Sequence, residues 1–251
     1  MTAAAADGRD AAARAEAVLA ELASLGSEEA RAGMARYGIE TGDAFGVSIS
    51  QLRPLAKGLG RDHDLALALW ATGNHEARLL ASMVDDPASV SAEQMDVWAA
   101  AFDSWDVCDQ VTSNLFDKTP HAWDKVQEWS AARDQWVKRA AFAMAAALAV
   151  QDKQAADGPF LEILELCRRE AGDDRNFVKK AVSWALRNIG KRNPRLHAAA
   201  IATAEAILAE AEERAAASRK DPAARSGRWV ARDALRELRS EKTLERVRRR
   251  G

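Results

Sequence analysis

A chain of 251 residues, 48% of them hydrophobic, can bury a large core and can form either one domain or two small ones. No apolar run reaches the roughly 18 residues of a membrane span, and residues 1–14 lack the basic start and apolar block of a secretory signal. Cys108, Cys167 and the four histidines have no disulfide or zinc spacing. We therefore expect a cytoplasmic protein without a structural metal.

The charge is close to balanced overall but unevenly distributed along the chain. Residues 1–130 carry 21 acidic and 10 basic side chains, whereas residues 131–251 carry 17 acidic and 26 basic ones. Such asymmetry points to a polyanionic partner for the C-terminal half. The alternative is a solvated charged face with no partner, since charge informs on association rather than on fold.

The residue types and their periodicity predict helices throughout. Alanine dominates, while glycine and proline number only 14 and 6, and good helix formers lose little rotamer freedom in a helix. Helical periodicity begins near Ala11, and the first apolar stripe runs from Ala17 to Leu25 and ends at Gly26, with Ser27 as the next N-cap. Residues 37–47 contain three glycines and are predicted to form a loop, after which Ser50 is predicted to cap a helix.

Further helices are predicted along the rest of the chain. Two short ones cover 63–70 and 75–84, and Ser91 begins another with Gln94 in a pattern similar to a capping box. Near the C-terminus the predicted helices are 196–217 and 228–238, followed by a frayed basic tail over 246–250. We expect a single all-helical domain over 1–251, flexible at about 1–10 and 240–251.

Four helix starts share a similar sequence. They are Glu76-Ala77-Arg78-Leu79, Asp106-Val107-Cys108-Asp109, Trp136-Val137-Lys138-Arg139 and Phe177-Val178-Lys179-Lys180. Their spacing of roughly 30, 30 and 41 residues is typical of helix pairs stacked in an α-solenoid. Within this alignment Asp109, Arg139 and Lys180 occupy one repeat position, so a solenoid would place them along one groove.

Two tryptophans accompany these charged positions. Trp105 precedes Asp109 by four residues and Trp184 follows Lys180 by four, so each pair shares a helix face. Interleaved indoles and cations suit a phosphate backbone and a sugar or base face. The alternatives are that the indoles belong to the core, that Asp109 pairs with a lysine, and that Trp136 to Arg139 is an exposed basic turn. Candidate DNA contacts are Lys138, Arg139, Lys179, Lys180, Arg187, Lys191 and Arg192.

The ordered set of motifs resembles the DNA alkylation repair glycosylases of the AlkD type. The resemblance rests on Trp105-Asp106-x-x-Asp109, on Trp136-x-Lys138-Arg139 and on Phe177-Val178-x-Lys180-Ala181-x-x-Trp184-x-Leu186-Arg187. Phe45-Gly46-Val47 and Leu52-Arg53-x-Leu55-Ala56-Lys57 look like the family's early segment, and the likeness runs from about Tyr37 to Leu238.

The resemblance implies a solenoid of HEAT-like repeats whose concave cleft binds duplex DNA. Members hydrolyse the N-glycosidic bond of N3- and N7-alkylated purines without metal or cofactor and without flipping the base into a pocket. By resemblance Asp109 would be the catalytic carboxylate, Trp105 and Trp184 the walls beside the lesion, Arg139 a phosphate contact, and Lys180 and Arg187 further backbone contacts.

The function expected from the sequence is that of a monomeric DNA glycosylase, nucleoid-associated if the source is bacterial. Its partner would be duplex DNA containing alkylated bases. Two other functions stay open at this stage. One is a DNA-binding solenoid without catalysis, and the other is a helical scaffold that binds proteins.

Overall fold

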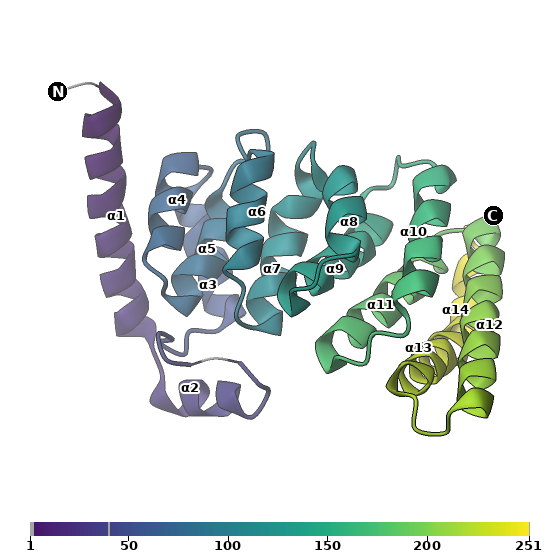
Figure 1. Cartoon of the computed structure of the whole chain (residues 1–251). Helices are drawn as coiled ribbons and strands as arrows, with labels where there is room; N and C mark the ends of the chain where they lie inside the picture. Colours follow the sequence, from purple (N-terminus) through teal and green to yellow (C-terminus); the bar gives the residue numbers. More distant parts are fainter. Residues whose placement is uncertain (1–2, 40, 251) are drawn as a thin grey trace. The chain divides into compact units, whose positions relative to one another are not determined.

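The computed structural model describes residues 3–39 and 41–250, with side-chain surroundings from residue 10 onward. Every regular element in this part of the chain is helical (Figure 1). The chain divides into two compact units, Met1–His121 and Ala122–Gly251. A single domain over 1–251 stays a prediction, and each unit is described here on its own.

The N-terminal unit consists of one long helix followed by a series of short ones. Its α-helices are α1 (Ala3–Leu25), α2 (Glu28–Ala35), α3 (Ile49–Leu59), α4 (His63–Ala71), α5 (His75–Val84), α6 (Ala92–Ala100) and α7 (Trp105–Asn114), followed by the 3-10 helix η1 (Phe116–Lys118). Side chains of Ser27, Asp62, Asn74 and Ser91 accept bonds from the first-turn amides of α2, α4, α5 and α6. These caps satisfy amides that no helical carbonyl can reach.

Helices of the N-terminal unit pack in two layers. One layer places α5 between α3 and α7, and the other places α1 against α4, which itself packs on α5 (Figure 1). The core between them is aromatic as well as aliphatic. The buried rings of Trp70 and Trp98 stack with centroids 4.1 Å apart, and Phe102 meets Trp70 edge-on at 6.1 Å.

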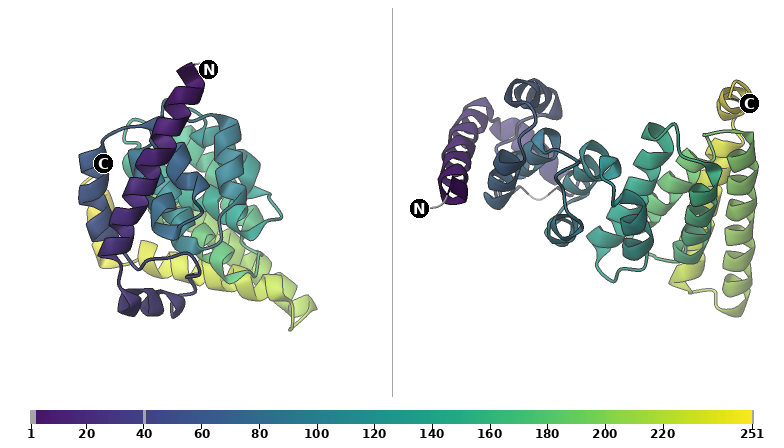
Figure 2. Two further views of the ribbon diagram at one scale, coloured as in Figure 1. Left: turned by 90° about the vertical axis from the view of Figure 1, so that its left-hand side faces the viewer. Right: turned by 90° about the horizontal axis from the view of Figure 1, so that it is seen from above.

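The C-terminal unit repeats this two-layer arrangement. Its helices are α8 (Ala122–Ser130), α9 (Gln135–Gln151), α10 (Asp157–Glu170), α11 (Asn176–Ile189), α12 (Pro194–Ala217), α13 (Pro222–Leu238) and α14 (Glu241–Arg248). Helices α9, α11 and α13 pack in succession in one layer, and α8, α10 and α12 form the other. The two views of Figure 2 show α12 beside α13 in this unit. The arrangement confirms the predicted all-α solenoid class.

Small residues allow close packing in this unit. The alanine-rich segment 140–149 of α9 is buried throughout. At the end of α11, a Cβ on Gly190 would lie 2.7 Å from a methyl group of Leu238 and 2.8 Å from Cβ of Ala200. Real Cβ atoms are not found that close to other atoms, so glycine at 190 is what lets α11 approach both helices.

Several element boundaries differ from the sequence prediction. The N-cap of α3 is Ser48, not Ser50, because Gln51 three residues later completes its capping box. Helix α13 begins at Pro222, since Asp221 caps it and Ala223 donates to the Asp221 carboxylate at 2.8 Å. Most of the predicted basic tail lies in α14, which Ser240 caps.

Candidate active site and nucleic-acid interface

Trp105 and Asp109 lie one turn apart on α7, as their spacing predicts. Both side chains are half-buried. The Trp105 indole Nε1 donates a hydrogen bond of 2.9 Å to the carbonyl oxygen of Tyr37. The backbone carbonyl of Asp109 accepts bonds from the hydroxyls of Thr112 and Ser113 at 3.1 and 2.6 Å. The Trp105 indole is therefore fixed to the segment that follows α2. Hydrogen bonds from two hydroxyl side chains of α7 also stabilise the backbone of that helix at Asp109.

A buried ion pair fixes the first turn of α7. His75 Nε2 lies 3.0 Å from Asp106 Oδ2, and both residues are mostly buried. Burial alone would lower the pKa of His75, but the hydrogen bond and charge of Asp106 outweigh it and raise the pKa. Burial also acts to raise the pKa of Asp106, yet the bond to His75 leaves it lowered. This pair joins α5 to the helix that carries Asp109.

A fully buried carboxylate holds the loop opposite α5. Glu76 accepts three backbone N–H bonds: from Phe45 at 2.9 Å, from Gly46 at 2.7 Å and from Val47 at 3.1 Å. Gly46 has φ of +82°, a left-handed conformation that favours glycine, and a Cβ there would lie 2.3 Å from the carbonyl oxygen of Ser27. Glu76 thus supplies hydrogen-bond acceptors to loop N–H groups that are removed from water and would otherwise have no partner.

Tyr37 is a candidate site residue that the sequence analysis treated only as the start of a loop. Its side chain is 72% exposed, although its own carbonyl anchors the Trp105 indole. Tyr37 is the only tyrosine in the chain. The signal that could have singled it out is a lone aromatic residue beside Gly38 (φ +71°), because a large ring in a polar turn rarely serves the core.

In the C-terminal unit, Arg139 joins the starts of α9 and α11. Its Nη1 donates a 2.7 Å bond to the carbonyl oxygen of Phe177, and its guanidinium lies 5.9 Å from the centre of the Phe177 ring. Trp136 packs against the same ring at 4.9 Å. Arg139 is buried, with 6% of its surface exposed, so any phosphate contact would have to use the remaining face of the guanidinium.

Lys138 does not have the exposed position that the sequence analysis expected. It is buried and its Nζ lies 2.7 Å from Glu170 and 3.3 Å from Asp173. Burial of Asp173 acts to raise the pKa of that carboxyl, but bonds to Arg175 and Lys138 outweigh it and lower the pKa. Two carboxylates therefore already neutralise Lys138, and its contact with DNA stays a prediction.

Lys179, Lys180 and Trp184 project from α11 in more accessible positions. Lys180 is exposed and makes no ion pair with any described residue. Lys179 is half-buried and its Nζ lies 5.6 Å from the centre of the Trp229 ring. Trp184, one turn after Lys180, is half-buried rather than core. The structure thus brings these three together on one helix within the C-terminal unit.

Three cations near the end of α11 serve the packing of this unit instead. Arg187 and Lys191 both contact Glu237 on α13, the latter at 2.6 Å. Burial of Glu237 acts to raise its pKa, and the two ion pairs outweigh it and lower the pKa. Arg192 donates to the carbonyls of Ala149, Asp152 and Ala155 at 2.8–3.1 Å and lies over the Phe160 ring. These contacts give Arg187, Lys191 and Arg192 packing roles in this unit, and their contacts with DNA stay predictions.

A stripe of arginines on α13 is a further candidate for DNA binding that was not predicted from the sequence. Four arginines recur every three or four positions and border a depression of about 460 Å³, which Asp233 also lines: Arg225, Arg228, Arg232 and Arg236, with Trp229 between them. We call this set the α13 stripe. Trp229 is 38% exposed, and Arg236 is the member that pairs with a carboxylate, that of Asp233. The spacing of the arginines, three or four residues apart on a predicted helix, could have revealed this stripe from the sequence.

Two findings concern other classes of site. No three His, Cys, Asp or Glu side chains within the described residues come together as a metal-ion site would require. In the same part of the chain, every helix is too short or too polar to cross a membrane.

Comparisons with known proteins place the chain in a family. A family model described as DNA alkylation repair enzyme matches residues 18–238, so the chain belongs to this family. A solved structure with a TM-score of 0.68 covers 76% of this chain and 82% of its own at 24% identity. Its description is a new family of proteins related to the HEAT-like repeat DNA glycosylases, with affinity for branched DNA structures. The likeness shows a HEAT-like repeat fold. No match was found among curated proteins.

Proposed function

We propose that this protein is a DNA glycosylase that removes cationic N3- or N7-alkylated purines from duplex DNA and leaves an abasic site. Membership of the DNA alkylation repair family supports the substrate class. The observation that carries the proposal is Asp109, half-buried one turn from a Trp105 indole that is fixed by its bond to Tyr37. Asp109 would be the catalytic carboxylate, with Trp105 and Trp184 beside the lesion.

The chemistry requires little besides a placed carboxylate. An alkylated N3 or N7 purine already carries a positive charge, so it departs without a strong general acid. Asp109 would stabilise the oxocarbenium-like sugar by its negative charge and assist the attacking water as a base. Indole faces would add attraction to the cationic sugar and base. The step needs neither a metal nor a cofactor.

DNA would be bound mainly by cations on α11 and α13 of the C-terminal unit. Lys180 on α11 and the α13 stripe present cations that lack carboxylate partners within the described residues, except for Arg236. Such side chains contact phosphates and release counterions, which makes affinity depend on salt. Arg139 and Lys179 remain candidate contacts, with the packing roles described above.

The direct test of this function is base release. Alkylated genomic DNA is incubated with the protein, and bases in the supernatant are identified by mass spectrometry. We expect N7-methylguanine and N3-methyladenine above the level of spontaneous loss. DNA binding without release would instead support the second candidate, a non-catalytic DNA-binding solenoid. The structural neighbour is described as having affinity for branched DNA structures, which is consistent with DNA binding under either candidate.

Charge reversal tests whether the partner is DNA. We expect Lys180→Glu combined with Arg232→Glu to weaken duplex binding by about 100-fold at 0.1 M salt, because two phosphate contacts are lost and repulsion is added. Fluorescence anisotropy measures the change. Lys242→Glu with Arg248→Glu on α14 is the matched control, with the same change of charge at exposed positions. Equal affinities for the two double variants would favour a protein-binding scaffold.

A further inference from the structure

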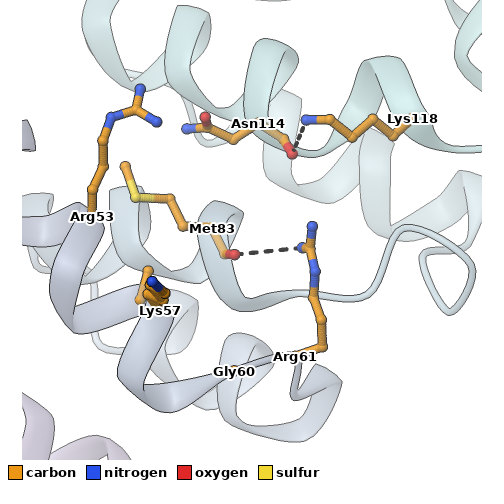
Figure 3. Close-up of a pocket in the computed structure, with 8 residues that line it drawn as sticks. Arg53, Lys57, Gly60, Arg61, Met83, Asn114 and Lys118 are labelled. Atoms are coloured by element: carbon orange, nitrogen blue, oxygen red, sulfur yellow. Dashed lines mark hydrogen bonds between the residues drawn. The ribbon is translucent and has the colours of Figure 1, made fainter.

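A cluster of cations in the N-terminal unit has no part in the proposed catalytic site. Residues 1–121 carry 19 acidic side chains and only nine Lys or Arg. Four of these nine line one surface depression of about 390 Å³ in which no lining residue is acidic. They are Arg53, Lys57, Arg61 and Lys118, and we call the set the cation cradle. Met83 and Asn114 contribute to its floor and wall (Figure 3).

Three other cations of the same unit are neutralised by carboxylates, whereas Arg36 is exposed and makes no ion pair with any described residue. The pairs within 3.0 Å are Arg14 with Asp62, Arg31 with Glu28, and Arg78 with Asp103. Within the cation cradle, Lys118 lies 3.6 Å from the Asp117 carboxylate. The Asp117 side chain is buried and does not line the depression. Nearly half of the cations of this acidic unit therefore line a depression that none of its carboxylates lines.

Local structure accounts for two of the four cations. Arg61 donates to the carbonyls of Met83 and Asp85 at the end of α5, and Lys118 donates to that of Ser113 at 3.0 Å at the end of α7. Carbonyls at helix C-termini attract cations through the helix dipole but do not cancel their charge. These bonds hold both groups at the rim of the depression.

No bond to a helix-end carbonyl accounts for the positions of the remaining two cations. Arg53 and Lys57 lie one turn apart on α3, are exposed, and make no ion pair with any described residue. Figure 3 shows the Arg53 guanidinium directed toward the Asn114 amide, across the opening from Arg61 and Lys118. Four like charges around one opening repel one another, and an anion placed between them would remove that repulsion.

We propose that the cation cradle binds a phosphate group of a DNA strand. Guanidinium groups bind phosphate oxygens with paired hydrogen bonds, and lysines add point charges. The proposal rests on the DNA binding of the proposed function but not on its catalytic step. It gives the acidic N-terminal unit an attachment to the polyanion that its net charge would otherwise repel.

The test compares DNA affinity over a range of salt concentrations. We expect Arg53→Ala with Lys57→Ala to weaken duplex binding by about tenfold at 0.1 M salt and to reduce the slope of log K against log salt by about one. The change removes two exposed side chains from a helix in which alanine is favoured, so the fold is expected to persist. Fluorescence anisotropy of the 251-residue protein with labelled duplex gives both values.

A charge-matched control variant and two kinds of duplex distinguish the possible outcomes of this experiment. Lys242→Ala with Arg248→Ala loses the same charge from exposed sites on α14 and should change the affinity less than twofold. Duplexes with and without a 5′-phosphate separate the two sources of the ligand. Equal loss on both supports a backbone phosphate, and loss confined to the phosphorylated duplex supports a terminal one. Wild-type affinity and slope on both, or no DNA binding by the wild type, would overturn the cradle. Absence of base release alone would overturn only the catalytic proposal.

Discussion

An Asp109→Asn variant is expected to bind alkylated duplex with wild-type affinity while releasing bases at least about 100-fold more slowly. Asparagine keeps the shape of the side chain and the helix that carries it, but it removes the negative charge. The bond-breaking step develops positive charge on the sugar, so loss of the carboxylate acts mainly on the transition state. Binding through Lys180 and the α13 stripe should persist, because the substitution leaves those cations unchanged.

The measurement is single-turnover release from an oligonucleotide with one N7-methylguanine, with affinity measured in parallel. Asp103→Asn is the matched control, because it removes an equal charge from an exposed carboxylate that pairs with Arg78 just before α7. We expect that control to stay within a fewfold of the wild-type rate. Release by the Asp109 variant at the rate of the control would remove Asp109 from the mechanism.

The largest effect on stability is expected at Glu76. Replacement by alanine leaves the amides of Phe45, Gly46 and Val47 without their acceptor, two of them in buried positions. We expect the free energy of unfolding to fall by about 4 kcal/mol, since unsatisfied buried donors and lost charge-assisted bonds both contribute. Urea denaturation followed by circular dichroism gives the difference.

Two further variants test the physical reason. In Glu76→Gln the amide oxygen can still accept from Gly46 and Val47, but the NH₂ group faces the Phe45 donor, so the loss should be about half as large. Glu16→Ala, at an exposed site on α1, should change stability by less than about 0.5 kcal/mol. Equal stability of Glu76→Ala and Glu16→Ala would contradict the role of this carboxylate.

The helices were predictable because their signals are local. Caps such as Ser27 and Ser91 lie within three residues of the amides that they bind, and apolar periodicity is visible over one or two turns. The predicted N-cap of α3, Ser50, lies two residues after the observed one, Ser48, because serine is a favourable cap at either position. Only Gln51, which bonds the Ser48 backbone N–H at 3.1 Å, distinguishes them.

The roles of the cations were harder to predict because their partners are distant in sequence. Arg187 is paired with a carboxylate 50 residues away, and Arg192 with carbonyls about 40 residues away. From sequence alone these side chains look the same as Lys180, which stays exposed. The spacing of Trp105 and Asp109 on one face needed only helix geometry, and it is confirmed. That both sets of residues line one groove stays a prediction.

Selective release of a charged base tests the central claim most directly. Saturating wild-type protein is mixed with two duplexes that differ only in whether one guanine carries an N7-methyl group, and the released base is quantified over time. We predict first-order loss of N7-methylguanine, faster than its spontaneous release, and no loss of guanine. Tight binding of the methylated duplex, with base loss no faster than in buffer, would contradict the glycosylase function.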